Sequence, residues 1–407
     1  MKNIPHLRGV PSRVGPGPYR VALVHSFYSS RQPSGENAAV RDQAEALGAA
    51  GHEVTVVAAH TDSLEQERGY AVRAAVRVAT GRGRSPLAEL EKFAPDVVHV
   101  HNLFPNFGTE WLDRWRGALV ATMHNYRPAC AAGTLFRDGK ACTRCPDGDR
   151  WEGLRRGCYR GSRFATAPLA WALRSGAAAH PVLRRTDRIV VLSERSRDLY
   201  LTFGLPAQRI VVVPNFVDVS DHSRTGNADI TPPSTGPRWL FIGRLGEEKG
   251  ILQLLQTWPR REHLDVIGSG PLESKCQQLA PDRVRFLGSF PRKRILDVLP
   301  GYTGLIFSSL AFENAPLVLP EALASGVPIL ARAGSSVADS VRKYGTGAVY
   351  HTNDELPRAL QNARTVFPGL REHCRKVYTE HYTAQSWNAA MTAVYEQAVS
   401  DHGVLTR

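Results

Sequence analysis

The sequence predicts an α/β protein of two domains, each built on a parallel sheet that helices cover on both faces. Short apolar segments of strand length alternate with segments of helical length throughout the 407 residues of the chain. With 43% hydrophobic and 22% charged residues, the composition is typical of a globular protein. A chain of this length exceeds what one hydrophobic core of ordinary size holds, so two separate cores are expected.

The first domain is predicted at residues 19–213, after a flexible basic tail at residues 1–18 that is rich in Pro and Gly. Six short apolar runs predict its strands, at residues 20–25, 53–58, 97–101, 119–123, 189–192 and 210–213. Residues 36–50 have apolar positions at helical spacing, and Gly51 directly after them is a helix stop signal. A helix is therefore expected between the first two strands.

A stretch rich in Pro, Gly, Ser and Asp, without any periodicity, predicts an interdomain linker at residues 214–237. The second domain is predicted at residues 238–380. Five further apolar runs predict its strands, at residues 239–242, 264–267, 284–287, 304–307 and 328–331. The C-terminal segment, residues 381–407, contains a predicted amphipathic helix at residues 384–399 and is expected to pack back on the first domain.

The segment FENAPLVLPEALASG carries two glutamates, Glu313 and Glu321, with seven residues between them. Pro316 is favoured at the first position of a helix, because its missing N–H would be unpaired there in any case. The free N–H groups at a helix N-terminus bind phosphate oxygens, and flanking carboxylates can accept hydrogen bonds from sugar hydroxyls. Standing alone, the pair would indicate only two solvated glutamates on a surface helix.

Upstream, the segment FIGRLGEEKG follows a predicted strand and carries two cations, Arg244 and Lys249, between Gly243 and Gly250. Fixed cations lower the barrier to glycosyl transfer, because negative charge builds up on the leaving diphosphate as the glycosyl bond breaks. Arg244 can bond phosphate oxygens in a forked geometry, while Lys249 supplies a point charge. Each would be an ordinary surface cation in isolation, and it is the similarity of their order and spacing to those of a known family that favours a donor site.

Together these segments resemble the signature of the retaining family 4 glycosyltransferases with the GT-B fold, and the resemblance extends over nearly the whole chain after the tail. It implies two Rossmann-like domains with the active site in the cleft between them. It also implies that Glu313 approaches the transferred sugar and that Glu321 binds the ribose hydroxyls of a nucleotide-diphosphate donor. The loop between the glutamates would present backbone amides to the sugar and diphosphate, from Asn314, Ala315, Pro316 and Leu317.

The resemblance implies further donor contacts from loops that follow predicted strands. Gly243 belongs to a Gly-Arg-Leu motif, Gly268 lies in GSGP, and Leu287 lies in RFLGSF, where the family's backbone contacts the base. In the first domain, Gly35 belongs to a small-residue loop that approaches the donor phosphates or the acceptor. That loop lacks the three-glycine dinucleotide fingerprint, which argues against a nicotinamide enzyme.

His124 follows the strand predicted at residues 119–123 and is similar to a histidine at the family's sugar-transfer centre. A lone histidine is often structural, but the carboxyl end of a strand is where open α/β sheets bind ligands. The resemblance implies transfer on one face of the sugar, with the leaving phosphate deprotonating the acceptor while His124 orients and polarises. Catalytic roles are therefore expected, without a metal cofactor, for His124, Glu313, Arg244 and Lys249.

Four of the six cysteines fall within an insert predicted at residues 130–158, and the middle two form a Cys-x-x-Cys pair; they are Cys130, Cys142, Cys145 and Cys158. The dipeptide Asp138-Gly139 between the first two is a strong hairpin turn signal. Four thiolates satisfy the tetrahedral geometry of structural zinc, and disulfides are disfavoured in a cytoplasmic protein. Structural zinc and reduced cysteines packed as small apolar groups are both open interpretations.

The formal charge of +13 predicts anionic partners, such as a nucleotide diphosphate or an anionic membrane surface. Nucleic acid is disfavoured, because the arginine clusters lack the interleaved aromatic residues of a single-strand platform. No apolar run is long enough to span a bilayer, and the N-terminus lacks the apolar region of a secretory signal. The expected location is therefore the cytoplasm, with peripheral contact at the inner membrane face.

Two other functions are consistent with the same motifs. A nucleotide-sugar epimerase or another GT-B enzyme would use a similar donor site, and it would turn over the donor without any acceptor. A non-catalytic nucleotide-sugar-binding protein would keep the fold without the transfer activity. The intact set of charged residues counts against this last alternative: Arg244, Lys249, Glu313 and Glu321.

Overall fold

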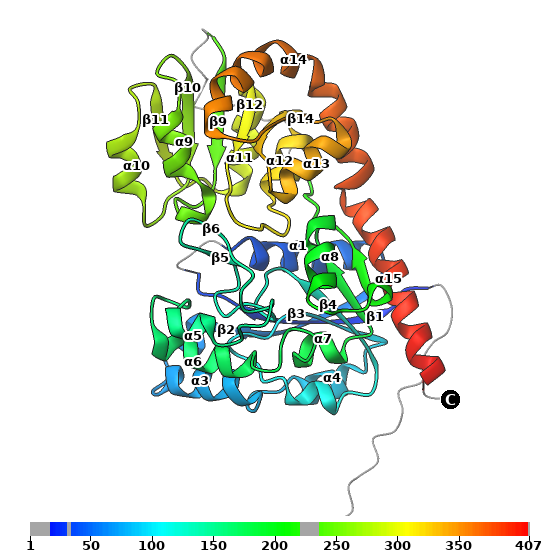
Figure 1. Cartoon of the computed structure of the whole chain (residues 1–407). Coiled ribbons are helices and arrows are strands. Elements are labelled where there is room, and N and C mark those ends of the chain that lie inside the picture. The colour runs from blue at the N-terminus through cyan, green and yellow to red at the C-terminus, as the bar shows by residue number, and fades with distance from the viewer. Residues whose placement is uncertain (1–16, 31–33, 220–235, 406–407) are drawn as a thin grey trace, which may run out of the picture.

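The structure is a computed structural model that describes residues 17–30, 34–219 and 236–405. Residues 1–16 of the predicted tail and residues 220–235 of the predicted linker lie outside this range. The described chain forms two six-stranded sheets whose strands all run parallel, one in the lower and one in the upper part of Figure 1. The predicted α/β class with two Rossmann-like domains is therefore confirmed.

The first sheet has the order β2-β1-β3-β4-β7-β8, so the chain crosses from one side of β1 to the other between β2 and β3. Its strands are β1 (Arg20–Phe27), β2 (Glu53–His60), β3 (Val97–Asn102), β4 (Ala118–Met123), β7 (Arg188–Val191) and β8 (Ile210–Val212). Alternate residues of β1 belong to different cores: Val21 and Leu23 pack on one face of the sheet, Ala22 and Val24 on the other. This alternation is the two-residue period of a strand buried on both faces.

The second sheet has the order β11-β10-β9-β12-β13-β14. This is a doubly wound order, in which successive strands are added on one side of β9 and then, from β12 on, on its other side. Its strands are β9 (Arg238–Ile242), β10 (His263–Ile267), β11 (Val284–Gly288), β12 (Gly304–Phe307), β13 (Ile329–Arg332) and β14 (Gly347–Tyr350). Each apolar run named in the sequence becomes a strand with ends shifted by two residues or fewer, whereas β14 was not among the predicted strands.

Helices cover both faces of each sheet. Those of the first domain are α1 (Gly35–Ala49), α2 (Thr61–Leu64), α3 (Tyr70–Thr80), α4 (Leu87–Phe93), α5 (Glu152–Arg156), α6 (Arg163–Ala172), α7 (Pro181–Arg185) and α8 (Glu194–Thr202). Those that follow the linker are α9 (Ile251–Thr257), α10 (Glu273–Leu279), α11 (Arg292–Val298), α12 (Val318–Ala324), α13 (Ser336–Tyr344), α14 (Leu356–His381) and α15 (Ala384–Leu405). Helix α1 begins directly after its N-cap Ser34, whose side chain accepts a hydrogen bond from the backbone N–H of Asn37.

The last two helices connect the domains on one side of the molecule, where they run from orange to red in Figure 1. Helix α14 buries Leu360 and Phe367 in the core of the second domain. Helix α15 instead packs Met391 and Tyr395 against the first sheet, next to Val21. The C-terminal helix thus completes the core of the first domain.

The cysteine-containing insert includes a two-stranded hairpin, with β5 (Phe136–Arg137) paired antiparallel to β6 (Lys140–Ala141). Its turn residues Asp138 and Gly139 have φ values of 51° and 73°. Positive φ at both central positions is what a type I′ turn requires, and Asp-Gly accommodates it at low cost. The hairpin expected from this dipeptide is confirmed.

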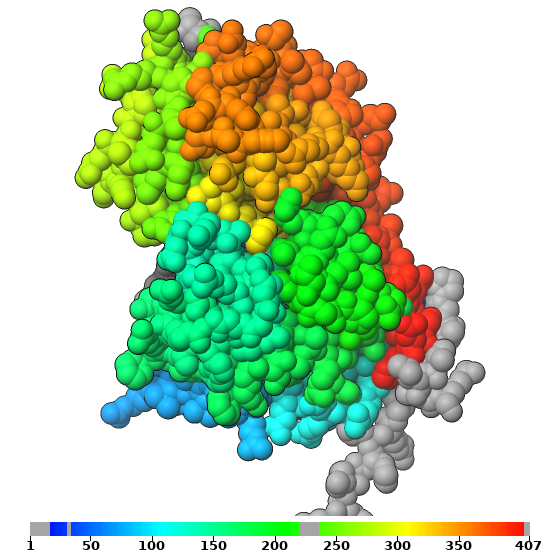
Figure 2. Space-filling view, in the orientation of Figure 1, coloured from blue at the N-terminus to red at the C-terminus, as the bar shows by residue number. Residues whose placement is uncertain are grey.

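The carboxyl ends of the two sheets face each other across the junction of the domains. The side chain of Asn314, in the loop after β12, donates a 3.1 Å hydrogen bond to the carbonyl of Met123 at the end of β4. In Figure 2 the yellow residues of the second domain lie at this junction, against the first domain. Since open α/β sheets bind ligands at their carboxyl ends, both binding edges border one cleft.

Candidate functional site

The centre of the candidate site is a pair of opposite charges between β9 and β12, where the strand order of the second sheet reverses. Nζ of Lys249, in the loop after β9, lies 2.7 and 2.9 Å from the two carboxylate oxygens of Glu313, in the loop after β12. Oγ of Ser309 also donates to this carboxylate, at 2.6 Å. Two residues that are 64 positions apart in the chain therefore meet at the carboxyl edge of the sheet.

The backbone next to Lys249 is packed so closely that only glycine fits at two positions. A Cβ on Gly250 would lie 2.2 Å from the carbonyl oxygen of Ser308, and Gly250 has a φ of +68°. A Cβ on Gly268 would lie 1.9 Å from the carbonyl oxygen of Gly243, and Gly268 has a φ of +144°. The loops after β9, β10 and β12 are thus fixed against one another, and a ligand can approach their backbone closely.

Arg244 lies beside this pair but is directed toward solvent. Its guanidinium donates to the carboxylate of Glu248 at 2.6 Å, and 58% of its side chain is exposed. A side chain with this exposure is free to exchange its partner for a phosphate, since a surface ion pair contributes little stability. Leu287, at the end of β11, lies on the same carboxyl edge of the sheet and is half-buried.

Glu321 is separated from the other charges and is buried in α12. Nε of Arg292 lies 3.3 Å from its carboxylate, and Nη1 of the same guanidinium bonds Asp42 of the first domain. Burial raises the pKa of Glu321 to about 7, although the charge of Arg292 opposes the shift. Helix α12 begins at Val318, two residues after the predicted Pro316, so Glu321 lies one turn inside the helix.

The loop between the two glutamates holds the domains together. Oγ of Ser196 donates to the side-chain oxygen of Asn314 at 2.9 Å, and Asn215 donates to the carbonyl of Ala315 at 3.1 Å. A Cβ built on Gly35 would meet Leu317 at 3.8 Å, so the start of α1 also faces this segment. The side chain of Asn314 is therefore occupied by the first domain, and the carbonyl of Ala315 by the start of the linker.

In the first domain, the predicted His124 belongs to a group of histidines on three adjacent strands. Its Nε2 lies 2.9 Å from Nδ1 of His101, and His99 bonds Thr122 and Tyr395 at 2.7 and 2.8 Å. Burial lowers the pKa of His124 to about 3, and neighbouring histidines add to the effect. The imidazole of His124 is therefore neutral at physiological pH and can orient a polar group without carrying charge.

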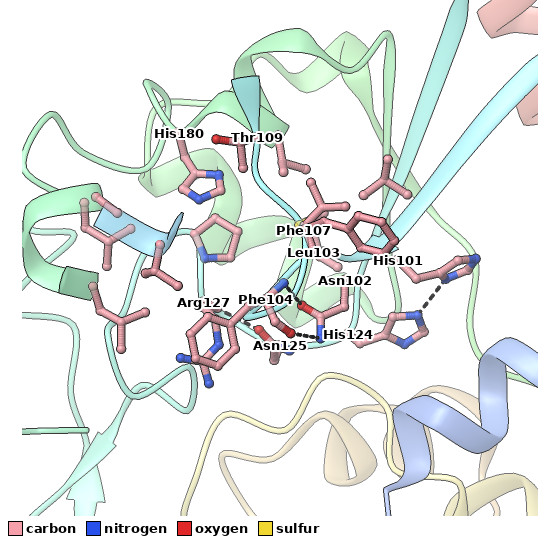
Figure 3. Close-up of a pocket in the computed structure, with 18 of the residues that line it drawn as sticks. His101, Asn102, Leu103, Phe104, Phe107, Thr109, His124, Asn125, Arg127 and His180 are labelled. Carbon is pink, nitrogen blue, oxygen red and sulfur yellow. Dashed lines mark hydrogen bonds between the residues drawn. The ribbon is translucent and has the colours of Figure 1, made fainter. Parts of the chain in front are cut away.

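A cavity of about 90 Å³ lies next to His124 within the first domain (Figure 3). Its walls are mostly apolar, and its residues include Leu103, Phe104, Phe107, Leu169, Leu173 and Val182. The polar groups on its wall include His101, Asn102, Asn125 and Arg127, and Figure 3 shows Thr109 and His180 on the side away from Asn125 and Arg127. Among the described residues, Nε2 of His101 and Nε of Arg127 are buried without a hydrogen-bond partner. An apolar cavity with a few polar groups is typical of a small-molecule site.

Glu36 was not among the predicted site residues, although it follows Gly35 in the first turn of α1. Nδ2 of Asn125, next to His124 in the chain, donates to its carboxylate at 3.0 Å. Burial raises the pKa of Glu36 to about 7, whereas the bond from Asn125 opposes the shift. The sequence predicts Glu36 at the start of a helix that faces the cleft, but a carboxylate in the first turn is also an ordinary helix preference, so its bond to Asn125 could not be predicted.

The four clustered cysteines line one small cavity beneath the hairpin, but all of them are free thiols. Among the described residues, no group of three or more His, Cys, Asp and Glu side chains is arranged to hold a metal ion. The structure therefore does not contain the predicted zinc centre. A buried carboxylate holds the insert instead: Glu152 forms ion pairs of 2.9–3.5 Å with Arg137, Arg144, Arg155 and Arg156.

The structure thus groups the predicted residues into three separate sets. Lys249 and Glu313 are in direct contact, with Arg244 beside them; Glu321 lies apart in α12; and His124 lies in the first domain. The partners that complete these sets are Ser309, Arg292 and His101. Arg292 is one of three cations in the sequence PRKR, and nothing in that sequence distinguishes it from its neighbours.

Comparison with known proteins identifies the family in both halves of the chain. The family model described as Glycosyltransferase Family 4 matches residues 33–221, and that described as Glycosyl transferases group 1 matches residues 225–365. A D-inositol 3-phosphate glycosyltransferase of Nocardia farcinica is 28% identical over 53% of this chain and 55% of its own length. A putative colanic acid biosynthesis glycosyltransferase of Escherichia coli is 26% identical over 46% of this chain and 49% of its own length. The chain thus spans about half the length of these curated relatives.

Solved structures of low sequence identity share the whole architecture. The sucrose-phosphate synthase of Thermosynechococcus elongatus has a TM-score of 0.67 at 17% identity, covering 94% of this chain and 99% of its own. An Anabaena protein solved with UDP and glucose has a TM-score of 0.58 at 14% identity, and the match covers 92% of this chain and 99% of the Anabaena chain. Identities this low support the shared fold, and the family models supply the assignment.

Proposed function

Because this chain is a family 4 glycosyltransferase with the GT-B fold, we propose that it transfers a sugar from a nucleotide-diphosphate donor to a hydroxyl acceptor with retention at the anomeric carbon. The observation that carries the proposal is the contact between Lys249 and Glu313 at the switch point of the second sheet. It joins the two sequence motifs that were expected to hold the diphosphate and the transferred sugar.

On the donor side, Lys249 and Arg244 would bind the diphosphate and offset the charge that develops on it as the glycosyl bond breaks. Glu313 would accept hydrogen bonds from the sugar hydroxyls. Glu321, in the adjacent helix, would bind the ribose hydroxyls. Backbone groups of Gly243 and Gly268 would line the diphosphate, because no side chain shields the loops there.

On the acceptor side, the neutral imidazole of His124 would orient the sugar and the incoming hydroxyl group. The acceptor oxygen then bonds the anomeric carbon on the face from which the phosphate oxygen leaves, and that phosphate oxygen takes the acceptor's proton. Atoms and charge balance without a metal or a protein nucleophile. Addition of a chelator is therefore expected to leave the rate of transfer unchanged.

The proposal is tested by the double substitution Arg244→Ala and Lys249→Ala. We expect a loss of at least about 10²-fold in kcat/KM, because two cations at the leaving group are removed. The matched control removes two exposed cations of the same domain, Arg260→Ala and Lys376→Ala, and should retain the activity of the parent chain. UDP-glucose is the first donor to assay, since the Anabaena neighbour was solved with UDP and glucose.

Three results would contradict this proposal. Unchanged turnover in the Arg244 and Lys249 variant would reject the donor site, provided that circular dichroism shows an intact fold. Turnover of the donor to an epimeric nucleotide sugar, with no acceptor present, would instead favour the epimerase alternative. Donor binding without any turnover, across a panel of acceptors, would favour a non-catalytic binding protein.

A further inference from the structure

An exposed aromatic surface lies on the outer side of the first domain, on α6 and at the start of α5. The side chain of Phe164 is 94% exposed, that of Trp171 is 50% exposed, and that of Trp151 is 40% exposed. The rings of Trp151 and Trp171 are 6.5 Å apart, and Phe164 lies two helical turns before Trp171 on the same face of α6. Three large aromatic residues exposed on one surface are unusual unless a partner covers them.

Arginines surround these aromatic side chains. Residues 144–174 contain seven arginines and three acidic residues. Arg163 precedes Phe164 and is exposed, and the guanidinium of Arg174 lies 4.5 Å from the ring centre of Trp171. Of the acidic residues, Glu152 is buried, Asp149 is paired with Arg155, and Asp147 accepts a hydrogen bond from Thr143. Because arginines outnumber acidic residues seven to three, the net charge of this segment is positive.

The opposite face of α6 borders the cavity beside His124. Leu169, Ala172 and Leu173 line that cavity, whereas Phe164 and Trp171 point away from it. A single helix, about 10 Å across, thus separates the aromatic surface from the cavity. The neighbouring α3, which packs on α6, also exposes Val72 and Val76, at 69% and 54%.

We propose that the exposed face of α5 and α6 docks this enzyme on an anionic lipid bilayer. A helix that carries Trp and Phe beside Arg matches the interface of a membrane, where aromatic rings enter the headgroup region and guanidinium groups pair with lipid phosphates. The docked enzyme holds its acceptor-side cavity close to the bilayer, which suits an acceptor with a lipid portion. The docking itself does not depend on the proposed transfer reaction.

Sedimentation of the full chain with vesicles tests the proposal. Vesicles of phosphatidylcholine that contain about 30% phosphatidylglycerol should bind the protein. Vesicles of pure phosphatidylcholine should bind it much less. The double substitution Phe164→Ser and Trp171→Ser should weaken binding at least about tenfold, since it removes the inserted rings. Charge reversal by Arg163→Glu and Arg174→Glu should weaken it similarly and remove most of its salt dependence.

The matched control is Val366→Ser, which changes a 54% exposed apolar residue on α14 in the other domain. It should bind vesicles like the parent chain. All variants should keep the parent melting temperature, because the substituted side chains are exposed. Equal binding by the parent chain and the Phe164 and Trp171 variant would overturn the proposal. A second result would also overturn it: the parent chain does not bind the vesicles, and the Phe164 and Trp171 variant forms a smaller species than the parent chain. The surface would then be an interface between two copies of the chain.

Discussion

At the scale of single residues, burial sets the protonation of the groups in the cleft. Burial lowers the pKa of His124 to about 3 and raises the pKa of Glu321 to about 7. The histidine is thus neutral at physiological pH. The glutamate exchanges its proton near neutral pH, and a ligand that donates hydrogen bonds to the carboxylate would favour its charged form.

The raised pKa of Glu321 predicts a specific dependence of stability on pH. Between the ordinary pKa of 4.5 and the folded value of about 7, the folded chain binds a proton that the unfolded chain has lost. The contribution of this group to the free energy of unfolding therefore decreases as the pH rises through that window. Glu321→Gln has no such loss, so its stability relative to the parent chain should increase by about 2–3 kcal/mol from pH 5 to pH 8.

Urea unfolding at several pH values without nucleotide measures this difference. Glu372→Gln, a change at an exposed position of α14, serves as the control and should show no comparable trend. If the difference in the free energy of unfolding between Glu321→Gln and the parent chain is constant from pH 5 to pH 8, the carboxylate of Glu321 is already ionised in the folded chain throughout this range.

At the scale of elements, the site is made by loops at the carboxyl ends of strands that are neighbours in the second sheet. The loops after β9 and β12 meet because these strands pair at the point where the chain order reverses. Their contact leaves no room for a side chain at Gly250, and the contact between the loops after β9 and β10 leaves none at Gly268. The position of Lys249 relative to Glu313 therefore depends on glycines that have no chemical role.

The substitution Gly268→Ala tests this dependence. Its Cβ would lie 1.9 Å from the carbonyl oxygen of Gly243, so the two loops must separate. We expect a loss of about 1–3 kcal/mol in the free energy of unfolding and weaker donor binding in calorimetry. Gly48→Ala is the matched control, because a Cβ there meets nothing within 4 Å and the helical position should gain about 0.5–1 kcal/mol. If Gly268→Ala leaves the affinity for the donor unchanged, close packing of these loops is not required for donor binding.

At the scale of the whole molecule, a few polar contacts and the last two helices set the relative position of the domains. Asn314 bonds Met123 and Ser196 across the junction, and Arg195 of α8 forms a 2.7 Å ion pair with Asp339 of α13. A groove of about 430 Å³ remains between the domains beside these contacts. Among the described residues, no helix is long and apolar enough to cross a membrane.

Asn314→Ala should loosen the junction. It removes the side-chain donor to the carbonyl of Met123, at a cost of about 1–3 kcal/mol, and one of the partners of Ser196, whose hydroxyl still bonds Tyr126 and Ser193. Small-angle scattering should show a larger radius of gyration, because the domains separate more readily. Asn353→Ala removes a similar bond, to the carbonyl of Gln253 within the second domain, and should leave the scattering unchanged. Identical scattering for the two variants would show that Asn314 does not hold the domains together.

The fold class and the paired charges could be derived from sequence because both rest on local signals. Alternating apolar runs give parallel strands, and the glycines and cations after a strand end predict where the donor-side loops lie. Helix α14 was not predicted as one element, since Pro368 and Gly369 in its middle read as breakers while burial of Leu360 and Phe367 keeps the helix intact. Strand β14 lies at the edge of its sheet and is mostly half-buried, so its sequence lacks the strongly apolar run of the central strands.

Contacts between distant segments were decided by the tertiary structure alone. The sequence by itself determined which residue types stand at the strand ends, because strand period and turn chemistry are local properties. Only the packed domains decided that Arg292 reaches both Glu321 and Asp42, that His101 bonds His124, and that four cysteines surround a cavity without forming a metal centre. The physical reason is that side-chain partners and burial depend on how sheets twist and domains meet, and no short stretch of sequence contains that geometry.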